Sequence, residues 1–344
     1  MMMMATAAAL VPEAAVLAGQ ARALLVWKAS LDDQSQHTLQ SWENISAPCS
    51  WRGITCTRQQ RRPVISGISL RGMRLRGALG PLDFSALATL TSLDLSHNHL
   101  SGSIPAGIEV LGELRALLLQ SNQIRGSIPL GLANLTKLRS LMLHENEISG
   151  GIPRHIGNMS NLTKLTTLYL DGNQLSGQIP QEFGQLVNLE ELELNTNTLS
   201  GSIPITIGNL TKLTRLYLFQ NQLLGQIPRV LGYMMNLKEL ALYENTLSGN
   251  IPRNLCNLTK LTVLILSRNR LSGQIPQELG YLVNLNDLDL TFNTLSGPIP
   301  VTIGNLTKLN ILSLFMNQLS GQIPRELGYL VNLEELDLNI NKLS

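Results

Sequence analysis

Leucines alternate with variable residues in a pattern that recurs along most of the chain. The stretch "NLTKLTRLYLFQNQLLGQIP" begins at Asn209, and close copies begin at Asn257 and Asn305. When the copies are aligned on the asparagine that follows the alternating segment, they lie 24 residues apart, except for one interval of 27 between Asn146 and Asn173. Internal periods of this length are typical of solenoids, in which each unit stacks only on its neighbours.

Each part of the consensus L-x-x-L-x-L-x-x-N-x-L-S-G-x-I-P predicts a local structure. The alternation of leucines with period two predicts a short strand with one buried face. The asparagine amide both donates and accepts, so a column of such amides can satisfy the backbone groups of the turn after each strand. The Ser-Gly and Ile-Pro pairs then break any helix and turn the chain. The consensus matches the leucine-rich repeat.

Residues 63–344 are predicted to form about twelve repeats, the first degenerate, with Met73 in the asparagine position, and the last incomplete. Twelve strands at about 4.8 Å spacing would make a concave sheet roughly 50 Å long. A terminal repeat exposes its apolar side, so a cap is needed, and we assign the cap to residues 22–62. Leu24, Trp27 and Leu31 predict an amphipathic helix in it.

Residues 1–21 form an apolar, alanine-rich segment that has two interpretations. Small residues near its end are typical of a secretory signal peptide. No basic residue precedes Arg22, however, and Pro12 and Glu13 interrupt the apolar stretch. An incorrect or truncated start of the sequence is therefore the alternative.

The N-terminal unit and the repeat sequence resemble those of one plant family. The segments "ALLVWKASL", "LQSW" and "PCSWRGITC" resemble the N-terminal cap of plant leucine-rich-repeat receptor-like kinases, and the repeat "GNLTKL…LSGQIPxELGYLVNLEEL" is similar to their male-discoverer-interacting branch. The resemblance runs from about Arg22 to Ser344. It implies an α/β solenoid, a right-handed plant-type superhelix with a second set of short strands and a helical N-terminal cap.

The resemblance also implies a function, a location and a disulfide. It implies the extracellular ectodomain of a plasma-membrane receptor, which binds a secreted peptide or protein ligand and pairs with a co-receptor leucine-rich-repeat kinase. In that family the two cysteines of the cap motif are bonded, which implies a disulfide between Cys49 and Cys56. Cys256 occupies a position where sister repeats carry glycine, so we expect a buried, unreactive thiol.

The chain departs from that family in the motifs it lacks. No uninterrupted apolar run approaches the roughly 18 residues of a membrane span. The glycine-rich loop and the HRD and DFG triplets of a kinase are absent from the sequence, which stops in mid-repeat at "LNINKLS". We therefore expect a fragment of a longer receptor or a shortened gene product, which is not an enzyme by itself and needs no cofactor.

Composition and isolated motifs exclude other kinds of site. The 344 residues carry a net charge of +2, and aromatic residues make up only 4% of them. A nucleic-acid partner is not expected, because neither a strong positive field nor base-stacking platforms follow from these values. His97 and His99 flank one asparagine, but no cysteine or carboxylate completes a ligand set, so no metal site is expected.

Seven N-x-[ST] sequons are candidate glycosylation sites. They are Asn44, Asn134, Asn158, Asn161, Asn209, Asn257 and Asn305. Several recur because "NLTK" is copied with the repeat, so they are also explained as by-products of duplication. We expect those in the repeats to lie on the convex side, where a glycan leaves the concave face free.

The variable residues between the strand leucines are expected to face the concave surface and to carry the function. The candidate ligand-binding residues combine aromatic rings with carboxylates: Tyr169, Glu193, Tyr217, Phe219, Glu239, Tyr243 and Asp289. Such a face suits an extended peptide with basic residues, because aromatic rings supply apolar contact and carboxylates pair with cations. The alternative is a solvated sheet face with no ligand.

Two other functions remain open at this point. One is a secreted inhibitor or defence protein of the polygalacturonase-inhibitor type, which has similar repeats but capping cysteines at both ends. The other is an ice-binding solenoid, which needs a flat and regular array of threonine or similar residues. The irregular concave columns and the missing C-terminal cysteine pair favour ligand recognition.

Overall fold

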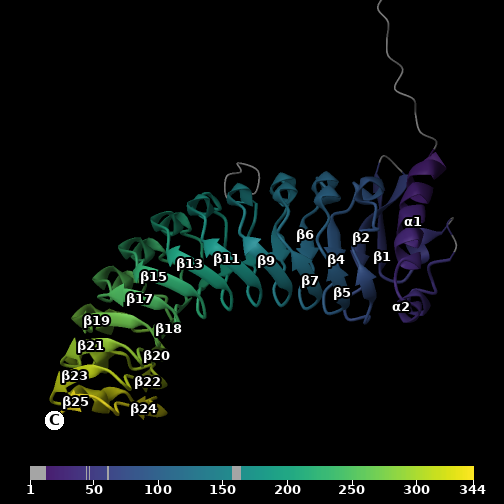
Figure 1. The fold of residues 1–344 in the computed structure, drawn as a ribbon. Coiled ribbons are helices and arrows are strands. Elements are labelled where there is room, and N and C mark those ends of the chain that lie inside the picture. The colour runs from purple at the N-terminus through teal and green to yellow at the C-terminus, as the bar shows by residue number, and fades with distance from the viewer. Residues whose placement is uncertain (1–12, 44, 46, 60–61, 157–163) are drawn as a thin grey trace, which may run out of the picture.

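The protein is a curved solenoid with a helical cap at its N-terminal end (Figure 1). The computed structural model describes residues 13–43, 45, 47–59, 62–156 and 164–344. Two sheets follow the arc, and short helical turns lie along its outer edge. The expected leucine-rich-repeat solenoid, with its second set of strands and its helical N-terminal cap, is confirmed.

The inner sheet begins with one antiparallel pair and continues as a parallel ladder with one strand per repeat. Its strands within the described residues are β1 (Ile54–Gln59), β2 (Arg62–Ser69), β4 (Ser92–Asp94), β6 (Ala116–Leu118), β8 (Ser140–Met142), β10 (Thr167–Tyr169), β12 (Glu191–Glu193), β14 (Arg215–Tyr217), β16 (Glu239–Ala241), β18 (Val263–Ile265), β20 (Asp287–Asp289), β22 (Ile311–Ser313) and β24 (Glu335–Asp337).

The second sheet is also a parallel ladder and is built from the L-S-G segments. Its strands are β3 (Arg76–Ala78), β5 (His99–Gly102), β7 (Gln123–Gly126), β9 (Glu147–Gly151), β11 (Gln174–Gln178), β13 (Thr198–Ser202), β15 (Gln222–Gln226), β17 (Thr246–Gly249), β19 (Arg270–Gln274), β21 (Thr294–Gly297), β23 (Gln318–Gly321) and β25 (Lys342–Leu343).

Short 3-10 turns follow the Ile-Pro pair, or Asp83 in the first repeat, and return the chain to the inner sheet. The proline fixes an extended conformation just before the turn, as at Pro204 with φ −66° and ψ 137°. In the repeats these turns are η2 (Phe84–Leu87), η3 (Ala106–Val110), η4 (Leu130–Asn134), η5 (Arg154–Ile156), η6 (Gln181–Gln185), η7 (Ile205–Asn209), η8 (Arg229–Tyr233), η9 (Arg253–Asn257), η10 (Gln277–Tyr281), η11 (Val301–Asn305) and η12 (Arg325–Tyr329).

One continuous core runs through the solenoid, because each repeat buries its leucines against the next. In β12 the middle residue Leu192 is fully buried, whereas Glu191 and Glu193 on either side are partly exposed. The same alternation occurs in most of the other three-residue inner strands. The period-two pattern therefore leaves two columns of variable side chains on the inner surface.

The consensus asparagine ties each repeat to the preceding one. The side-chain nitrogen of Asn197 donates to the carbonyls of Leu170 (3.0 Å) and Leu194 (3.1 Å), and its oxygen accepts from the amide of Leu175 (2.9 Å). The residue before it, Thr196, adopts the left-handed conformation with φ 52°. The ladder of amides predicted from the sequence is thus present, and each amide satisfies backbone groups of two repeats.

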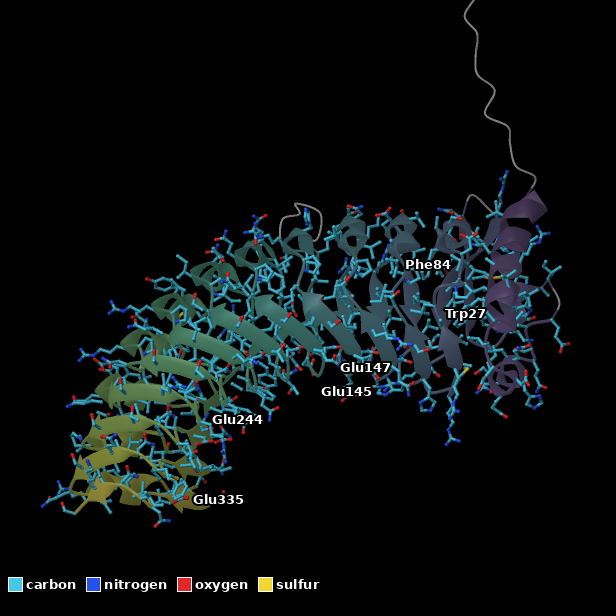
Figure 2. All side chains as sticks on the ribbon, in the orientation of Figure 1. Trp27, Phe84, Glu145, Glu147, Glu244 and Glu335 are labelled. Atoms are coloured by element: carbon cyan, nitrogen blue, oxygen red, sulfur yellow. A yellow bond between two sulfur atoms is a disulfide. The ribbon has the colours of Figure 1, made fainter. Side chains whose placement is uncertain are left out.

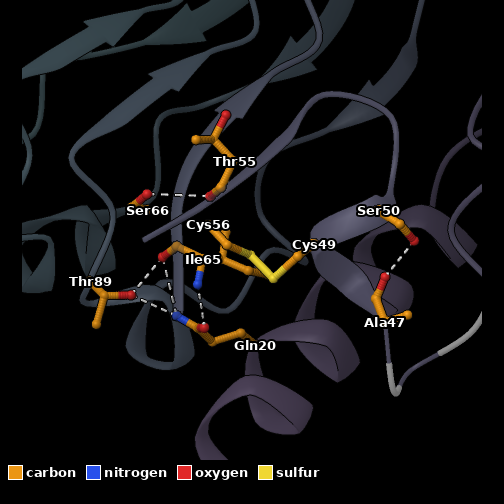
Figure 3. The surroundings of a disulfide bond; sticks show 9 residues. All are labelled: Gln20, Ala47, Cys49, Ser50, Thr55, Cys56, Ile65, Ser66 and Thr89. Atoms are coloured by element: carbon orange, nitrogen blue, oxygen red, sulfur yellow. Dashed lines mark hydrogen bonds between the residues drawn. A yellow bond between two sulfur atoms is a disulfide. The ribbon is translucent and has the colours of Figure 1, made fainter. Parts of the chain in front are cut away.

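The cap consists of α1 (Glu13–Ala29), α2 (Asp33–Thr38), η1 (Pro48–Ser50) and the β1–β2 pair. Trp42 stacks on Trp51 with ring centroids 5.5 Å apart, and Trp27 lies 6.3 Å from Trp42. The disulfide between Cys49 and Cys56 is present (Figure 3). The disulfide links η1 covalently to β1, next to Trp51 of this aromatic stack.

The cap begins earlier than the sequence suggested. The boundary expected after residue 21 lies inside α1, which starts at Glu13. Gln20 is buried, and its side chain accepts from the amide of Ile65 (2.9 Å) and donates to Thr89 (2.7 Å), which joins the helix to the first repeats (Figure 3). The sequence missed this because one polar residue in an apolar stretch does not reveal its partners.

No helix in the described part is long and apolar enough to cross a membrane.

Candidate functional site

The inner, concave surface of the arc collects the variable side chains of successive repeats. Glu145, Glu244 and Glu335 mark it in Figure 2, where they lie along the inner edge of the solenoid. Each predicted ligand-binding residue lies on this surface and is partly buried. Tyr169, Glu193, Tyr217, Glu239 and Asp289 belong to the strands β10, β12, β14, β16 and β20. Phe219 and Tyr243 each follow a strand by two residues.

Three aromatic rings form a continuous cluster on the concave surface, and we call it the aromatic cluster. The ring of Phe219 stacks on that of Tyr243, with centroids 4.3 Å apart and an interplanar angle of 10°. Tyr217 lies 5.7 Å from Phe219 in a tilted arrangement. This contact follows from the repeat spacing, because neighbouring parallel strands place equivalent positions within reach. Together the three rings form an apolar platform that spans two repeats.

An arginine that the sequence analysis did not select lies at the centre of the acidic residues. Arg215 on β14 reaches Glu239 (3.1 Å), Glu193 (3.3 Å) and Glu191 (3.6 Å) on the strands to either side. Two tyrosine hydroxyls add to this network, since Tyr217 donates to Glu239 and Tyr169 donates to Glu191. We call this set the Arg215 network.

The Arg215 network changes the expected role of two carboxylates. Burial would raise the pKa of Glu239, but the hydrogen bonds from Tyr217 and Arg215 outweigh it and lower that pKa. Burial raises the pKa of Glu193 even though Arg215 opposes the shift. Both carboxylates already have a cationic partner. They are therefore less available to a basic ligand than the sequence suggested.

A second group of acids on the same surface has no such partner. Asp287 and Asp289 on β20, with Glu335 and Asp337 on β24, form no ion pair within the described residues. Burial raises the pKa of Asp287, and the neighbouring charges of Asp289 and Glu335 add to the shift. This group, which we call the β20–β24 acids, is the uncompensated negative part of the concave surface. Asp289 lies two strands from β16 and so not in the aromatic cluster.

A column of polar side chains precedes the aromatic cluster along the chain, and its members were not among the predicted site residues. Gln120, His144, Asp171 and Asn195 occupy equivalent positions in four successive repeats, and each has a buried side-chain atom without a hydrogen-bond partner. Burial, followed by the charge of Glu193, raises the pKa of Asp171 to about 7. An alignment of the repeats identifies this column, because Phe219 and Tyr243 occupy the same position in later repeats.

A second aromatic pair lies beyond the cluster. Phe292 meets Phe315 edge to face with centroids 5.2 Å apart, and the guanidinium of Arg268 lies 4.3 Å from the ring centre of Phe292. Arg268 also approaches Glu244 at 3.5 Å. This pair connects the aromatic cluster with the β20–β24 acids along the concave surface.

The remaining predicted sites lie elsewhere. Asn134, Asn209, Asn257 and Asn305 are exposed at the ends of η4, η7, η9 and η11 on the outer edge of the arc. Asn44, Asn158 and Asn161 lie outside the described residues. Cys256 is free and buried, and burial raises its pKa to about 12. Among the described residues, no three His, Cys, Asp or Glu side chains are grouped to hold a metal ion.

Family models match most of the solenoid. Residues 17–57 match the leucine rich repeat N-terminal domain, residues 153–272 match a leucine-rich repeat region, and residues 89–111, 137–159 and 284–306 match single leucine rich repeats. All of these models describe repeats or their N-terminal cap. The matched residues are therefore leucine-rich repeats and their N-terminal cap.

Curated relatives from Arabidopsis thaliana, several of them named as receptor-like kinases, are much longer than the chain. LRR receptor-like serine/threonine-protein kinase RGI3 is 41% identical over 90 residues, which is 26% of this chain and 8% of that protein. Protein MALE DISCOVERER 2 is 37% identical over 91 residues, 26% of this chain and 13% of that protein. The chain thus spans only a small part of the relatives it matches.

Solved ectodomains share the fold over nearly the whole chain. The ectodomain of GASSHO1/SCHENGEN3 from Arabidopsis thaliana, in complex with CASPARIAN STRIP INTEGRITY FACTOR 2, is 35% identical with a TM-score of 0.85, covering 94% of this chain and 41% of that one. A chain in the structure of the Arabidopsis receptor kinase HAESA in complex with the peptide hormone IDA and the co-receptor SERK1 is 25% identical with a TM-score of 0.52, covering 94% of this chain and 94% of that one.

Proposed function

Because the chain belongs to the leucine-rich-repeat proteins of the plant receptor-kinase ectodomain type, we propose that it recognises a secreted peptide on its concave surface. The aromatic cluster of Tyr217, Phe219 and Tyr243 carries this proposal. Three adjoining rings on a water-facing sheet offer an apolar platform, and interface hot spots are rich in such anchors. The similar ectodomains named above were solved with peptide or protein ligands, which supports the same kind of ligand here.

The charges on the concave surface favour a ligand with a basic segment. The β20–β24 acids have no ion pair with any cation in the described part of the chain, so a lysine or arginine of the ligand would replace lost hydration with an ion pair. Tyr169, Glu193 and Glu239 surround Arg215 and shape the surface next to the aromatic cluster. In this proposal the ligand rests on the aromatic cluster and extends past Phe292 to Asp289.

We propose in addition that the protein acts outside the cell and pairs with a co-receptor leucine-rich-repeat kinase. The complex of HAESA with a peptide hormone and SERK1 supports this arrangement for a solenoid of the same fold. Signalling would then depend either on the partner kinase or on a kinase domain like the one for which the longer relative RGI3 is named.

The experiment is a calorimetric screen of synthetic secreted-type peptides, some containing lysine or arginine. For a peptide that binds, Phe219→Ala should weaken binding roughly tenfold or more, as for an interface anchor. Asp289→Asn should mainly flatten the salt dependence of binding. Leu224→Ala is the matched control, because Leu224 is exposed on β15 in the other sheet. Unchanged binding by Phe219→Ala would disprove a site on the aromatic cluster.

A further inference from the structure

The outer edge of the solenoid alternates between sequon asparagines and exposed tyrosines. The last residue of each helical turn from η7 to η12 is Asn209, Tyr233, Asn257, Tyr281, Asn305 and Tyr329 in that order. Successive turns pack side by side, so each of these residues is next to the last residue of the turn before and after it. Within the two sheets, neighbouring strands are about 4.8 Å apart. We call this row the tyrosine–sequon ridge.

The tyrosines of the ridge expose most of their surface. Tyr233 and Tyr281 are each 60% exposed and Tyr329 is 58% exposed. Two residues further along, each of these repeats exposes an aliphatic side chain as well, namely Met235, Val283 and Val331. Single exposed apolar residues are ordinary, but a row of them repeating along one edge needs an explanation.

The intervening repeats place a glycosylation acceptor at the same two positions. Asn257 takes the place of the tyrosine, and Thr259 takes that of the aliphatic residue, with both side chains exposed. The carbonyl of Thr259 accepts from the side chain of Asn284 at 2.8 Å, which fixes the sequon against the next repeat. Lys260 does not cover the tyrosines, because its ammonium group donates to Asn236 at 2.7 Å.

We propose that N-linked glycans on Asn257 and Asn305 pack their first sugar against the flanking tyrosines and so cover the ridge. A pyranose ring has an apolar face of C–H groups that fits flat on an aromatic ring, and the contact removes apolar surface from water. Asn257 lies between Tyr233 and Tyr281, and Asn305 lies between Tyr281 and Tyr329. The first sugar therefore meets a ring on either side.

The glycan attaches in a group transfer from a lipid-diphosphate-linked oligosaccharide. The amide nitrogen of Asn257 attacks carbon C1 of the first sugar, and the N–C1 bond forms as the bond from C1 to the diphosphate oxygen breaks. The nitrogen loses one proton, and the lipid diphosphate leaves with the electron pair of the broken bond. No electrons are exchanged with an oxidant or reductant.

The chain contains its own control for this contact. Asn134 is an exposed sequon at the end of η4, but the preceding turn ends in Val110 rather than in a tyrosine. Asn209 is intermediate, with Gln185 on one side and Tyr233 on the other. The effect of a glycan should therefore be largest at Asn257 and Asn305 and smallest at Asn134.

The experiment uses the full chain secreted from a glycosylating plant-cell host behind a supplied leader. Intact mass gives the occupancy of each sequon, and the melting temperature gives stability. Thr259→Ala, which removes the glycan at Asn257, should lower the melting temperature by about 1–3 °C relative to Thr136→Ala, which removes the one at Asn134. With Tyr233→Ser and Tyr281→Ser in the background, this difference should vanish.

A second measurement does not depend on stability. The sugar protons of the glycan on Asn257 should be shifted upfield by the tyrosine rings, and those on Asn134 should not. An unoccupied Asn257, equal losses for the two sequon variants, a difference that persists without the tyrosines, or an absence of the ring-current shift would each overturn the proposal. None of these results bears on peptide binding at the concave surface.

Discussion

The ring of Phe219 stacks on the ring of Tyr243, one repeat further on, with centroids 4.3 Å apart and planes within 10° of parallel. The two residues occupy the same position of consecutive repeats, 24 residues apart in the sequence. The spacing between consecutive repeats therefore sets the distance between the two stacked rings. A solenoid can build a larger apolar platform this way only where neighbouring repeats both place an aromatic residue in that column.

Arg215 should stabilise the solenoid through the carboxylates around it. Arg215→Leu leaves Glu191, Glu193 and Glu239 partly buried without a cation, and we expect the free energy of unfolding to fall by about 1–2 kcal/mol at pH 7. Denaturant unfolding at pH 7 and at pH 4 measures this. The loss should shrink at pH 4, because burial raises the pKa of Glu193 and this carboxylate then takes up a proton. An equal loss at both pH values would contradict the account.

Asp171 should make stability depend on pH. Its pKa in the folded protein is raised to about 7, well above its ordinary value, mainly by burial. The folded state therefore binds the proton of Asp171 more tightly than the unfolded state does. The stabilisation that results is complete below about pH 4 and is lost as the pH rises through 7. Asp171→Asn should raise the melting temperature by about 2–4 °C at pH 8 and leave it unchanged at pH 4.

The control for Asp171 is Glu334→Gln, at an exposed acid just before β24. It should change the melting temperature little at either pH. If Glu334→Gln and Asp171→Asn have the same effect at pH 8, general charge repulsion rather than burial of Asp171 is the cause.

The asparagine ladder should be one of the most sensitive features of the fold. Asn197→Ala removes a side chain that bonds to the backbone of Leu170, Leu175 and Leu194, and those groups stay buried. We expect a loss of about 2–4 kcal/mol in the free energy of unfolding. Asn286→Ala, at an exposed position, is the comparison and should cost little. Similar losses for both variants would argue against the ladder.

The thiols should divide into one bonded pair and one free group. Without reductant, the unfolded protein should titrate one thiol, Cys256, and after reduction it should titrate three. Native protein should react slowly, because Cys256 is buried and its pKa is raised to about 12. Three free thiols in unreduced protein from a secretory host would contradict the disulfide.

The sequence predicted the fold well because its signal is repeated. The leucines, the asparagine and the Ile-Pro pair each have one structural role, and many copies of the pattern in register remove the ambiguity of a single short strand. The start of α1 at Glu13 was not predicted, since its evidence is the long-range hydrogen bonding of Gln20 to Ile65 and Thr89. Local sequence does not encode such partners.

The candidate site was predicted in part. The contact of Tyr217, Phe219 and Tyr243 follows from repeat spacing alone. The pairing of Glu193 and Glu239 with Arg215 does not, because a count of charges on a face cannot show which side chains meet across two strands. The unpaired atoms of His144 and Asp171 were missed for a similar reason, since burial depends on the neighbouring strands.

Hydroxyl-radical footprinting with a bound peptide tests the central claim most directly, because both the concave surface and the outer edge of the solenoid carry tyrosines. A peptide found by calorimetry should protect Tyr217, Phe219 and Tyr243 from oxidation. It should leave Tyr233 and Tyr281 on the outer edge as reactive as in the free protein. Protection of the outer tyrosines with unchanged oxidation of the aromatic cluster would contradict recognition on the concave surface.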